Sequence, residues 1–382
     1  LGAIFPPIIN VILALRCHGY SLDHPAVRGQ IEQLERLEIE EGDTLRLQPC
    51  KSPVWDTSQA LYALLESGLE PGEPAVLEAA EWLLDREVGQ AGDWQVRNPT
   101  VPIGGWYFEY ANEFYPDCDD TAEVMAALSR VRYPDASQAH RSDEALSRAV
   151  DWLLGMQNED GGWASFDRGC DMEVLAFVPF ADHNAMIDPS TADITSRAID
   201  ALTRCGVDTG DAAIQRAIRF LLDEQEADGS WFGRWGANYI YGTWLALTGL
   251  QAGGFDMRHE ACARAVEWLL SCQNDDGGWG ESLRSYDDPV WSGLGESTAA
   301  QTAWAVLALC VAGQVDSGAV VRGIEYLLGS QLDSGLWYDE QWTGTGFPQV
   351  FYLRYHYYAA YFPLLALAAG RRAIEPPPCL LY

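Results

Sequence analysis

One helical unit recurs along this chain, and the repetition limits the possible folds more than any other feature. Each copy has an Arg, an aromatic residue four positions later, two Leu, a Gln five positions after the aromatic residue, and a Gly-containing turn closed by Trp. The four copies run from Arg148 to Trp163, from Arg216 to Trp231, from Arg264 to Trp279 and from Arg322 to Trp337. A degenerate fifth copy is predicted from Trp82 to Trp94. Because one such unit cannot bury its apolar face alone, the copies must pack together.

Apolar stretches rich in small residues separate these copies and predict a second kind of helix. They span residues 55–65, 120–128, 193–202, 242–250, 298–309 and 357–368. A helix that is apolar all round has to be covered by an amphipathic one, so the two kinds predict two concentric layers. We therefore expect an all-α fold, with residues 1–382 forming a single (α/α)6 barrel. An open solenoid is the alternative, although polar capping repeats are not evident at either end.

The Gly, Gln and Trp residues that recur in each copy predict structural contacts between helices. Gly in the turns suits the left-handed conformation in which many helices end. The Gln side chain can hydrogen-bond to the backbone at the end of the next helix, and the closing Trp can stack over it. We expect these residues to hold the outer layer together rather than to take part in chemistry.

Composition excludes one class of function and suggests another. Asp and Glu outnumber Lys and Arg by 56 to 24, giving a net charge of -32. This charge repels the nucleic-acid backbone, so no nucleic-acid partner is expected. The 15 Trp, 17 Tyr and 12 Phe residues are more aromatic material than a core requires, and the surplus could line a cavity.

Cysteine usage and hydropathy bear on location. The nine cysteines are an odd number without CxxC pairs, which predicts a reduced, cytoplasmic protein. The longest apolar segment, Leu1 to Leu15, contains Pro6 and Asn10 and is shorter than the roughly 18 residues of a membrane span. Three roles remain open for it: peripheral contact with a membrane, a lid over a pocket, and a buried core helix.

The repeats and several motifs together resemble the squalene-hopene cyclase family. The motifs are the acidic run of residues 117–122 (DCDDTA) and the segments 52–57 (SPVWDT), 229–236 (GSWFGRWG) and 344–348 (GTGFP). The resemblance implies a class II terpene cyclase, an enzyme that starts cyclisation of a polyprenyl alkene by protonating it. In that family the matching segments form the catalytic barrel, and a second helical domain is built largely from sequence upstream, so we expect that second domain to be absent here.

A lone catalytic barrel resembles the single-domain meroterpenoid cyclases. That resemblance implies a hydrophobic polyprenylated aromatic substrate that is folded into fused rings. Two alternatives remain: a fragment of a cyclase that acts on squalene, and a non-catalytic helical-repeat scaffold. The oligomeric state is not indicated by the sequence.

The acidic run has the chemistry that alkene protonation requires. An alkene is a very weak base, so the donor must be a neutral carboxylic acid in a dry site. Clustered carboxyls cannot all ionise, and burial raises their pKa values further. The resemblance assigns Asp119 as the proton donor, with Asp117 and Asp120 orienting it. The plainer interpretation is that Asp117 or Asp119 only caps the helix that follows.

The resemblance also implies residues around the acid. Asp193 and Arg197 are expected to support the acid, Arg197 standing where the family has a His. Arg197 could donate a hydrogen bond to Asp117 but, being permanently charged, could not relay a proton. The aromatic positions expected to stabilise carbocations at the cavity are Trp55, Trp106, Phe108, Phe166, Trp235, Tyr241, Phe347, Phe351, Tyr355 and Tyr358. For each of them, ordinary core packing is an equally good interpretation.

Two polar residues fall near the predicted site, and the acidic motif and the histidines bear on whether it holds a metal. Arg354 and His356 fall near the cavity aromatics, where they are either exposed to solvent or able to anchor an acidic or phenolic head group. Asp-rich motifs can also bind magnesium around a diphosphate, but that chemistry needs basic residues that this acidic chain lacks. The histidines show no ligand spacing with Cys or Glu. We expect no metal and no cofactor.

Overall fold

The computed structural model describes residues 4–178 and 186–374, and these residues are mostly helical. Six of the described helices form an inner layer. They are α3 (Pro53–Glu66), α6 (Cys118–Leu128), α8 (Ala192–Arg204), α10 (Tyr239–Ala252), α12 (Ala299–Val311) and α14 (Tyr358–Ile374). Each inner helix packs against the next, and α14 packs against α3, so the ring is closed. This arrangement confirms the predicted all-α barrel.

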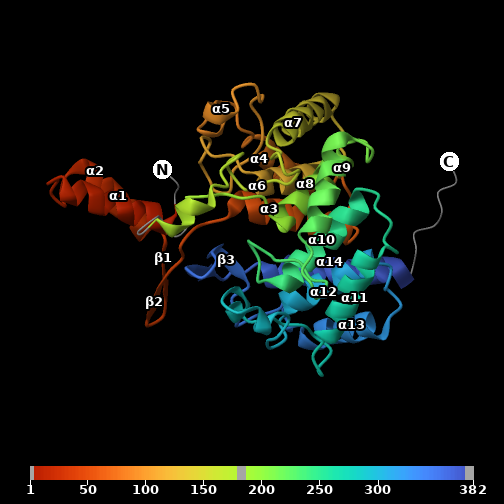
Figure 1. The fold of residues 1–382 in the computed structure, drawn as a ribbon. Coiled ribbons are helices and arrows are strands. Elements are labelled where there is room, and N and C mark those ends of the chain that lie inside the picture. The colour runs from red at the N-terminus through yellow and green to blue at the C-terminus, as the bar shows by residue number, and fades with distance from the viewer. Residues whose placement is uncertain (1–3, 179–185, 375–382) are drawn as a thin grey trace.

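Five described helices cover the ring from outside. They are α4 (Pro74–Leu84), α7 (Ala136–Gly155), α9 (Ala212–Asp223), α11 (Glu260–Ser271) and α13 (Gly318–Ser330). Helix α4 packs on α3, α7 on α6 and α9 on α8, while α11 and α13 each bridge two inner helices. Figure 1 shows α7 at one edge of the body and α13 at the opposite edge. The helices carrying the Gln and Trp repeats are therefore the outer layer, as predicted.

Shorter elements lie outside the two layers. Helices α1 (Phe5–Cys17) and α2 (Pro25–Glu35) pack together and project from the barrel (Figure 1). Residues 1–3 of the predicted Leu1 to Leu15 segment lie outside the described part of the chain. The remaining elements are β1 (Glu38–Glu41), β2 (Thr44–Leu47), α5 (Trp94–Arg97), the 3-10 helices η1 (Glu173–Phe177), η3 (Leu283–Tyr286) and η4 (Pro289–Trp291), β3 (Gly344–Phe347) and β4 (Phe351–Leu353).

The strands form two separate antiparallel hairpins that were not predicted from the sequence. In the first, Glu38 pairs with Leu47, and in the second, Gly344 pairs with Leu353. The second hairpin carries two of the aromatic residues that the sequence placed at the cavity. Phe347 and Phe351 are spaced like residues of a helix, but they lie on two facing strands, where their rings meet at 5.4 Å.

Small residues let the inner helices approach closely, as the sequence suggested. Helix α10 is buried around nearly its whole circumference. A Cβ atom on Gly249 of this helix would lie 2.7 Å from the Cα atom of Ser196 in α8. No side chain larger than hydrogen fits at that distance, so Gly249 sets the spacing between α8 and α10.

Each repeat is joined to the next by the Gln side chain. Nε2 of Gln157 donates to the carbonyl of Gly161 at 2.8 Å and to the carbonyl of Ala213, at the start of α9, at 2.9 Å. Arg216 of the following repeat donates to the Gln157 side-chain oxygen. The same contacts recur at Gln225 and Gln273. The Gln side chains thus hydrogen-bond to a backbone carbonyl in the first turn of the next outer helix, which is the kind of contact predicted.

The closing Trp of the degenerate repeat is Trp106, and the prediction of Trp94 is wrong. Nε1 of Trp106 donates to the carbonyl of Leu83 at 2.7 Å. In each of the other copies, Nε1 of the closing Trp donates in the same way to a Leu carbonyl of its own outer helix. Nε1 of Trp94 is buried without a hydrogen-bond partner. Glu87 stands at the Gln position and binds Arg148 through both carboxylate oxygens, at 2.7 and 2.8 Å. The segment that contains α5 lies between helix α4 and Trp106. It lengthens the spacing found in the other copies, so the sequence pattern did not reveal Trp106.

Candidate active site

The acidic run forms the start of α6, and hydrogen bonds to a neighbouring segment and within the first turn hold its backbone in place. Asp117 is extended, and its backbone N–H donates to the carbonyl of Trp106 at 2.9 Å. Oδ1 of Asp117 accepts the backbone N–H of Asp120 at 2.7 Å. Asp117 is therefore the helix cap that the plainer interpretation of the sequence anticipated. Capping directs Asp119 toward the neighbouring helix α8.

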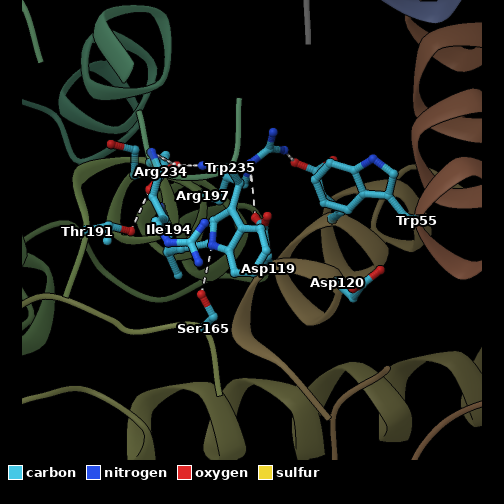
Figure 2. A network of polar contacts seen from close by, with 12 residues as sticks. Trp55, Asp119, Asp120, Ser165, Thr191, Ile194, Arg197, Arg234 and Trp235 are labelled. Carbon is cyan, nitrogen blue, oxygen red and sulfur yellow. Dashed lines mark hydrogen bonds and ion pairs between the residues drawn. The ribbon is translucent and has the colours of Figure 1, made fainter. Parts of the chain in front are cut away.

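Asp119 faces Arg197 across the interface between α6 and α8. Oδ1 of Asp119 lies 3.1 Å from Nε of Arg197, as Figure 2 shows. Arg197 contacts Asp119 rather than Asp117, the partner expected from the sequence. Nη2 of Arg197 donates to the hydroxyl of Tyr241 at 2.7 Å, and Nη1 pairs with the carboxylate of Glu123. A buried cation thus lies directly beside the candidate acid.

Burial favours the neutral form of all three acidic residues. Burial raises the pKa of Asp119 to about 7, and Arg197 opposes this shift. Burial also raises the pKa of Asp117 to about 7, against a lowering effect of its hydrogen bonds with Asp120. Burial and then the charge of Asp117 hold the pKa of Asp120 well above its usual value. The cluster can therefore keep protons at neutral pH.

Accessibility distinguishes Asp119 from its neighbours. Asp117 and Asp120 are 3% and 2% exposed, whereas 13% of the Asp119 side chain is exposed. Figure 2 shows the Asp120 side chain directed away from Arg197. A substrate in the barrel would therefore meet the Asp119 carboxyl before the other two.

Asp193 binds backbone N–H groups near the site. Its Oδ2 accepts the N–H groups of Arg234 and Trp235 at 2.8 and 2.9 Å, and its Oδ1 accepts the N–H of Ile194 at 3.0 Å. These bonds fix the loop that carries Trp235. Asp193 thus positions an aromatic residue, and its charge also raises the pKa of Asp119.

Several aromatic side chains surround the Arg197 guanidinium. The carbon of the guanidinium lies 4.9 Å from the ring centroid of Trp55 and 5.7 Å from that of Tyr241. Trp244, which sequence analysis missed, lies at 5.9 Å and stacks on Trp304. Its position three residues after Tyr241 in an apolar helix was a usable signal, because residues three apart share a helix face.

A second aromatic group lies on the loops at the ends of the inner helices. Phe166 and Trp235 meet edge to face at 6.3 Å, and Nε1 of Trp235 donates to the hydroxyl of Ser165 at 2.8 Å (Figure 2). The Arg234 guanidinium lies 4.2 Å from the Trp235 ring centroid and 5.5 Å from that of Phe347. Phe166 is 39% exposed, so this group borders the surface.

The remaining predicted aromatic residues connect the surface with the barrel interior. Phe108 meets Tyr355 edge to face at 6.5 Å, and Tyr355 stacks on Tyr358 at 4.5 Å. Tyr358 in turn contacts the Trp304 ring at 6.0 Å. Trp106 is fully buried and its indole nitrogen is bound to Leu83. Its assignment to the cavity remains a prediction beside this structural role.

Two cavities flank the site. The first, of about 180 Å³, lies inside the ring and is bordered by Glu123, Arg197 and Trp244. The second, of about 560 Å³, lies between the two hairpins and reaches Tyr355. Arg46, Arg354 and His356 border it. The Arg354 guanidinium lies 4.6 Å from the ring centroid of Tyr338.

Glu123 is the charged residue at the site that sequence analysis missed. It lies four residues after Asp119, which places the two on one face of α6. That spacing could have identified it, because a carboxylate on an apolar inner helix requires a partner.

The described part of the chain shows neither a metal-ligand cluster nor a membrane-spanning helix. No group of three His, Cys, Asp or Glu side chains arranged for a metal ion occurs in residues 4–178 and 186–374. His183 lies outside this range. None of the described helices is long and apolar enough to cross a membrane.

Sequence profiles match nearly the whole chain. The profile described as the squalene-hopene cyclase C-terminal domain matches residues 51–372, and that of the squalene-hopene cyclase N-terminal domain matches residues 1–43. A squalene-hopene cyclase of Zymomonas mobilis is 43% identical over 97% of this chain and 57% of its own length. That of Alicyclobacillus acidocaldarius is 44% identical over 98% of this chain and 59% of its own length. The chain thus spans less than two thirds of these relatives.

Solved structures share the fold at low sequence identity. The type II terpene cyclase MstE from Scytonema has a TM-score of 0.56 and 16% identity, over 96% of this chain and 98% of MstE. A variant of MstE has been solved with its substrate, geranylgeranyl dihydroxybenzoate, at a TM-score of 0.53 and 15% identity over 96% of both chains. At this identity the likeness concerns the fold alone.

Proposed function

Because this chain belongs to the squalene-hopene cyclase family, we propose that it cyclises a linear polyprenyl alkene, with Asp119 as the proton donor. The observation that carries the proposal is the position of the Asp119 carboxyl 3.1 Å from the Arg197 guanidinium, among aromatic side chains. A neutral carboxyl with a buried cation beside it can lose a proton to an alkene, because the cation stabilises the carboxylate that remains.

The proposed reaction starts with transfer of the Asp119 proton to the terminal alkene. The π electrons form a new C–H bond and leave a tertiary carbocation, which the next alkene attacks to form a C–C bond. Each later cation can be stabilised by an aromatic face, at about 0.5–2 kcal/mol. Loss of a proton or addition of a nucleophile ends the sequence, and water must later return a proton to Asp119.

For the substrate we favour an acyclic triterpene such as squalene. The relatives that are 43% and 44% identical carry that substrate in their names. The expectation of a polyprenylated aromatic acid depended on a lone barrel. Residues 1–43 match the profile of the N-terminal domain, so the idea of a lone barrel no longer favours a polyprenylated aromatic acid over squalene.

A polyprenylated aromatic acid is the second candidate substrate, because of the cavity between the hairpins. Arg46, Arg354 and His356 border that cavity in an otherwise acidic protein, so an acidic head group could bind there. Arg46 already pairs with Glu41 at 3.0 Å, which leaves Arg354 as the main attractive charge.

Peripheral contact with a membrane also remains a proposal, supported by the projecting helix α1. Its first residues, Phe5 and Pro6, border the same cavity. An apolar substrate dissolved in a membrane could reach the protein at this side.

Substitution of the acid tests the proposal. Asp119→Asn keeps the shape of the side chain but removes the acidic proton, so turnover of squalene and of geranylgeranyl dihydroxybenzoate should fall below detection. Mass spectrometry measures the products, and circular dichroism checks that the variant is folded. Asp200→Asn is the matched control, since Asp200 lies on α8 and pairs with its neighbour Arg204 at 2.7 Å. Turnover by a folded Asp119→Asn variant at the wild-type rate would assign the acid elsewhere.

A further inference from the structure

Arg197 is shared between two carboxyl groups of α6. Its side chain is 4% exposed and its guanidinium is always charged. Nε faces Asp119, and Nη1 faces Glu123 one helical turn later. One positive charge balances one carboxylate, and a second buried carboxylate would be uncompensated. One of the two groups should therefore carry a proton.

The geometry indicates which group is ionised. Nη1 of Arg197 pairs directly with Oε1 of Glu123. By contrast, Nε of Arg197 and Oδ1 of Asp119 are 3.1 Å apart but both lack a hydrogen bond, because their geometry is unsuitable. Glu123 is thus ion-paired with the cation, whereas Asp119 lies beside it without a hydrogen bond to it.

The surrounding groups do not offer another counter-ion for Arg197. Asp193 on the same helix is occupied by N–H groups of its own chain segment and of the Trp235 loop. Asp117 and Asp120 bond to one another at the start of α6. Other titratable groups facing this cluster include Asp56 on α3, Tyr241 on α10 and Tyr358 on α14. Glu66, Asp200 and Arg204 line the cavity beside Glu123, where Glu66 pairs with Arg130 and Asp200 with Arg204.

We propose that Glu123 is a positioning residue: as the ionised partner of Arg197, it holds the guanidinium beside Asp119 and leaves Asp119 protonated in the resting protein. The inference deepens the proposed function and rests on it, since it concerns the protonation of the same donor. When Asp119 gives up its proton, Arg197 is already in place to pair with the new carboxylate. Glu123 acts through Arg197 and has no contact with the reacting carbons in this scheme.

The pH dependence of Glu123→Gln tests the proposal. The amide can still hydrogen-bond to Arg197, but it removes the compensating charge, so Asp119 should ionise more readily. The pH above which turnover of squalene by the complete protein declines should fall by roughly 1–3 units, the effect of an unbalanced neighbouring cation. Lowering the pH should restore turnover, whereas a merely structural defect would lower turnover equally at every pH.

Three further variants separate charge from structure. Glu123→Asp keeps the charge and should keep the wild-type pH limit, even if turnover is lower. The double variant Glu123→Gln with Arg197→Gln removes both charges and should move the limit back up. Glu66→Gln is the matched control: Glu66 borders the same cavity but pairs with Arg130 at 2.7 Å, so its pH limit should not change.

Infrared spectroscopy gives a readout that does not need turnover. The band of the protonated Asp119 carboxyl, identified by its loss in Asp119→Asn, should titrate at lower pH in Glu123→Gln. An unchanged titration in Glu123→Gln would overturn the inference. If Asp119→Asn still cyclises squalene, the assignment of Asp119 as the donor fails, while this titration still tests the charge balance. Should Glu123→Gln not fold, the comparison of Glu123→Asp with the double variant decides the question.

Discussion

At the scale of single residues, the protonation state of Asp119 governs the expected activity. Burial raises its pKa to about 7, so the acid is protonated below that pH and loses its proton above it. Because only the protonated form can donate, kcat should decline as the pH rises through about 7. A pH profile with saturating squalene measures this. A kcat that stayed constant up to pH 9 would contradict it.

Trp106 and Trp94 provide a second prediction at this scale. Trp106→Phe removes the indole donor to the carbonyl of Leu83, which still accepts the backbone N–H of Arg86, and the lost hydrogen bond should lower the free energy of unfolding by about 0.5–1.5 kcal/mol. Trp94→Phe removes an indole N–H that has no partner and should cost less. Urea denaturation of both variants makes the comparison. An equal or larger loss for Trp94→Phe would restore Trp94 as the closing residue of its repeat.

The candidate site was predictable where its residues adjoin in sequence. Asp117, Asp119 and Asp120 lie within one helical turn, so their proximity follows from local geometry. Arg197 lies on another helix, and it was expected near the acid only because the sequence resembles a known family. Glu123 was missed because its partner is far away in sequence and an isolated Glu on a helix normally faces solvent.

At the scale of helices, the contact between α8 and α10 depends on one glycine. Gly249→Ala would put a Cβ atom 2.7 Å from the Cα atom of Ser196, next to Arg197. The backbones must then separate, which should lower the free energy of unfolding by about 1–3 kcal/mol and reduce turnover. Gly29→Ala in α2 is the control, since nothing lies within 4 Å of the added atom and Ala favours a helix. Wild-type stability of Gly249→Ala would show that the two helices have room to adjust.

The helices were easier to predict than the hairpins. The apolar inner helices and the Arg, Gln and Trp positions of the outer ones repeat, so each copy supports the assignment of the others. Strands β1 to β4 contain only three or four residues each, too few to show an alternating pattern. Phe347 and Phe351 of the second hairpin, together with Tyr355 just beyond it, even have the spacing of residues on one face of a helix.

At the scale of the whole molecule, the barrel could be predicted from the need to cover the apolar helices. The closure of the ring depends on a contact that no local pattern encodes, between α3 and α14. The assignment of residues 1–382 to a single domain remains a prediction.

Closure gives the barrel a seam whose two edges belong to distant parts of the chain. The hydroxyl of Tyr361 reaches Oδ1 of Asp56 at 3.4 Å, across 305 positions in sequence. Contacts of such long range form late in folding, because much of the chain must be ordered first. Partial opening at this seam would carry Trp55 away from Arg197 and admit water beside Asp119 while the other helix pairs stayed packed. How often the contact between α3 and α14 opens would then decide how long the site around Asp119 stays intact, rather than the strength of the barrel as a whole.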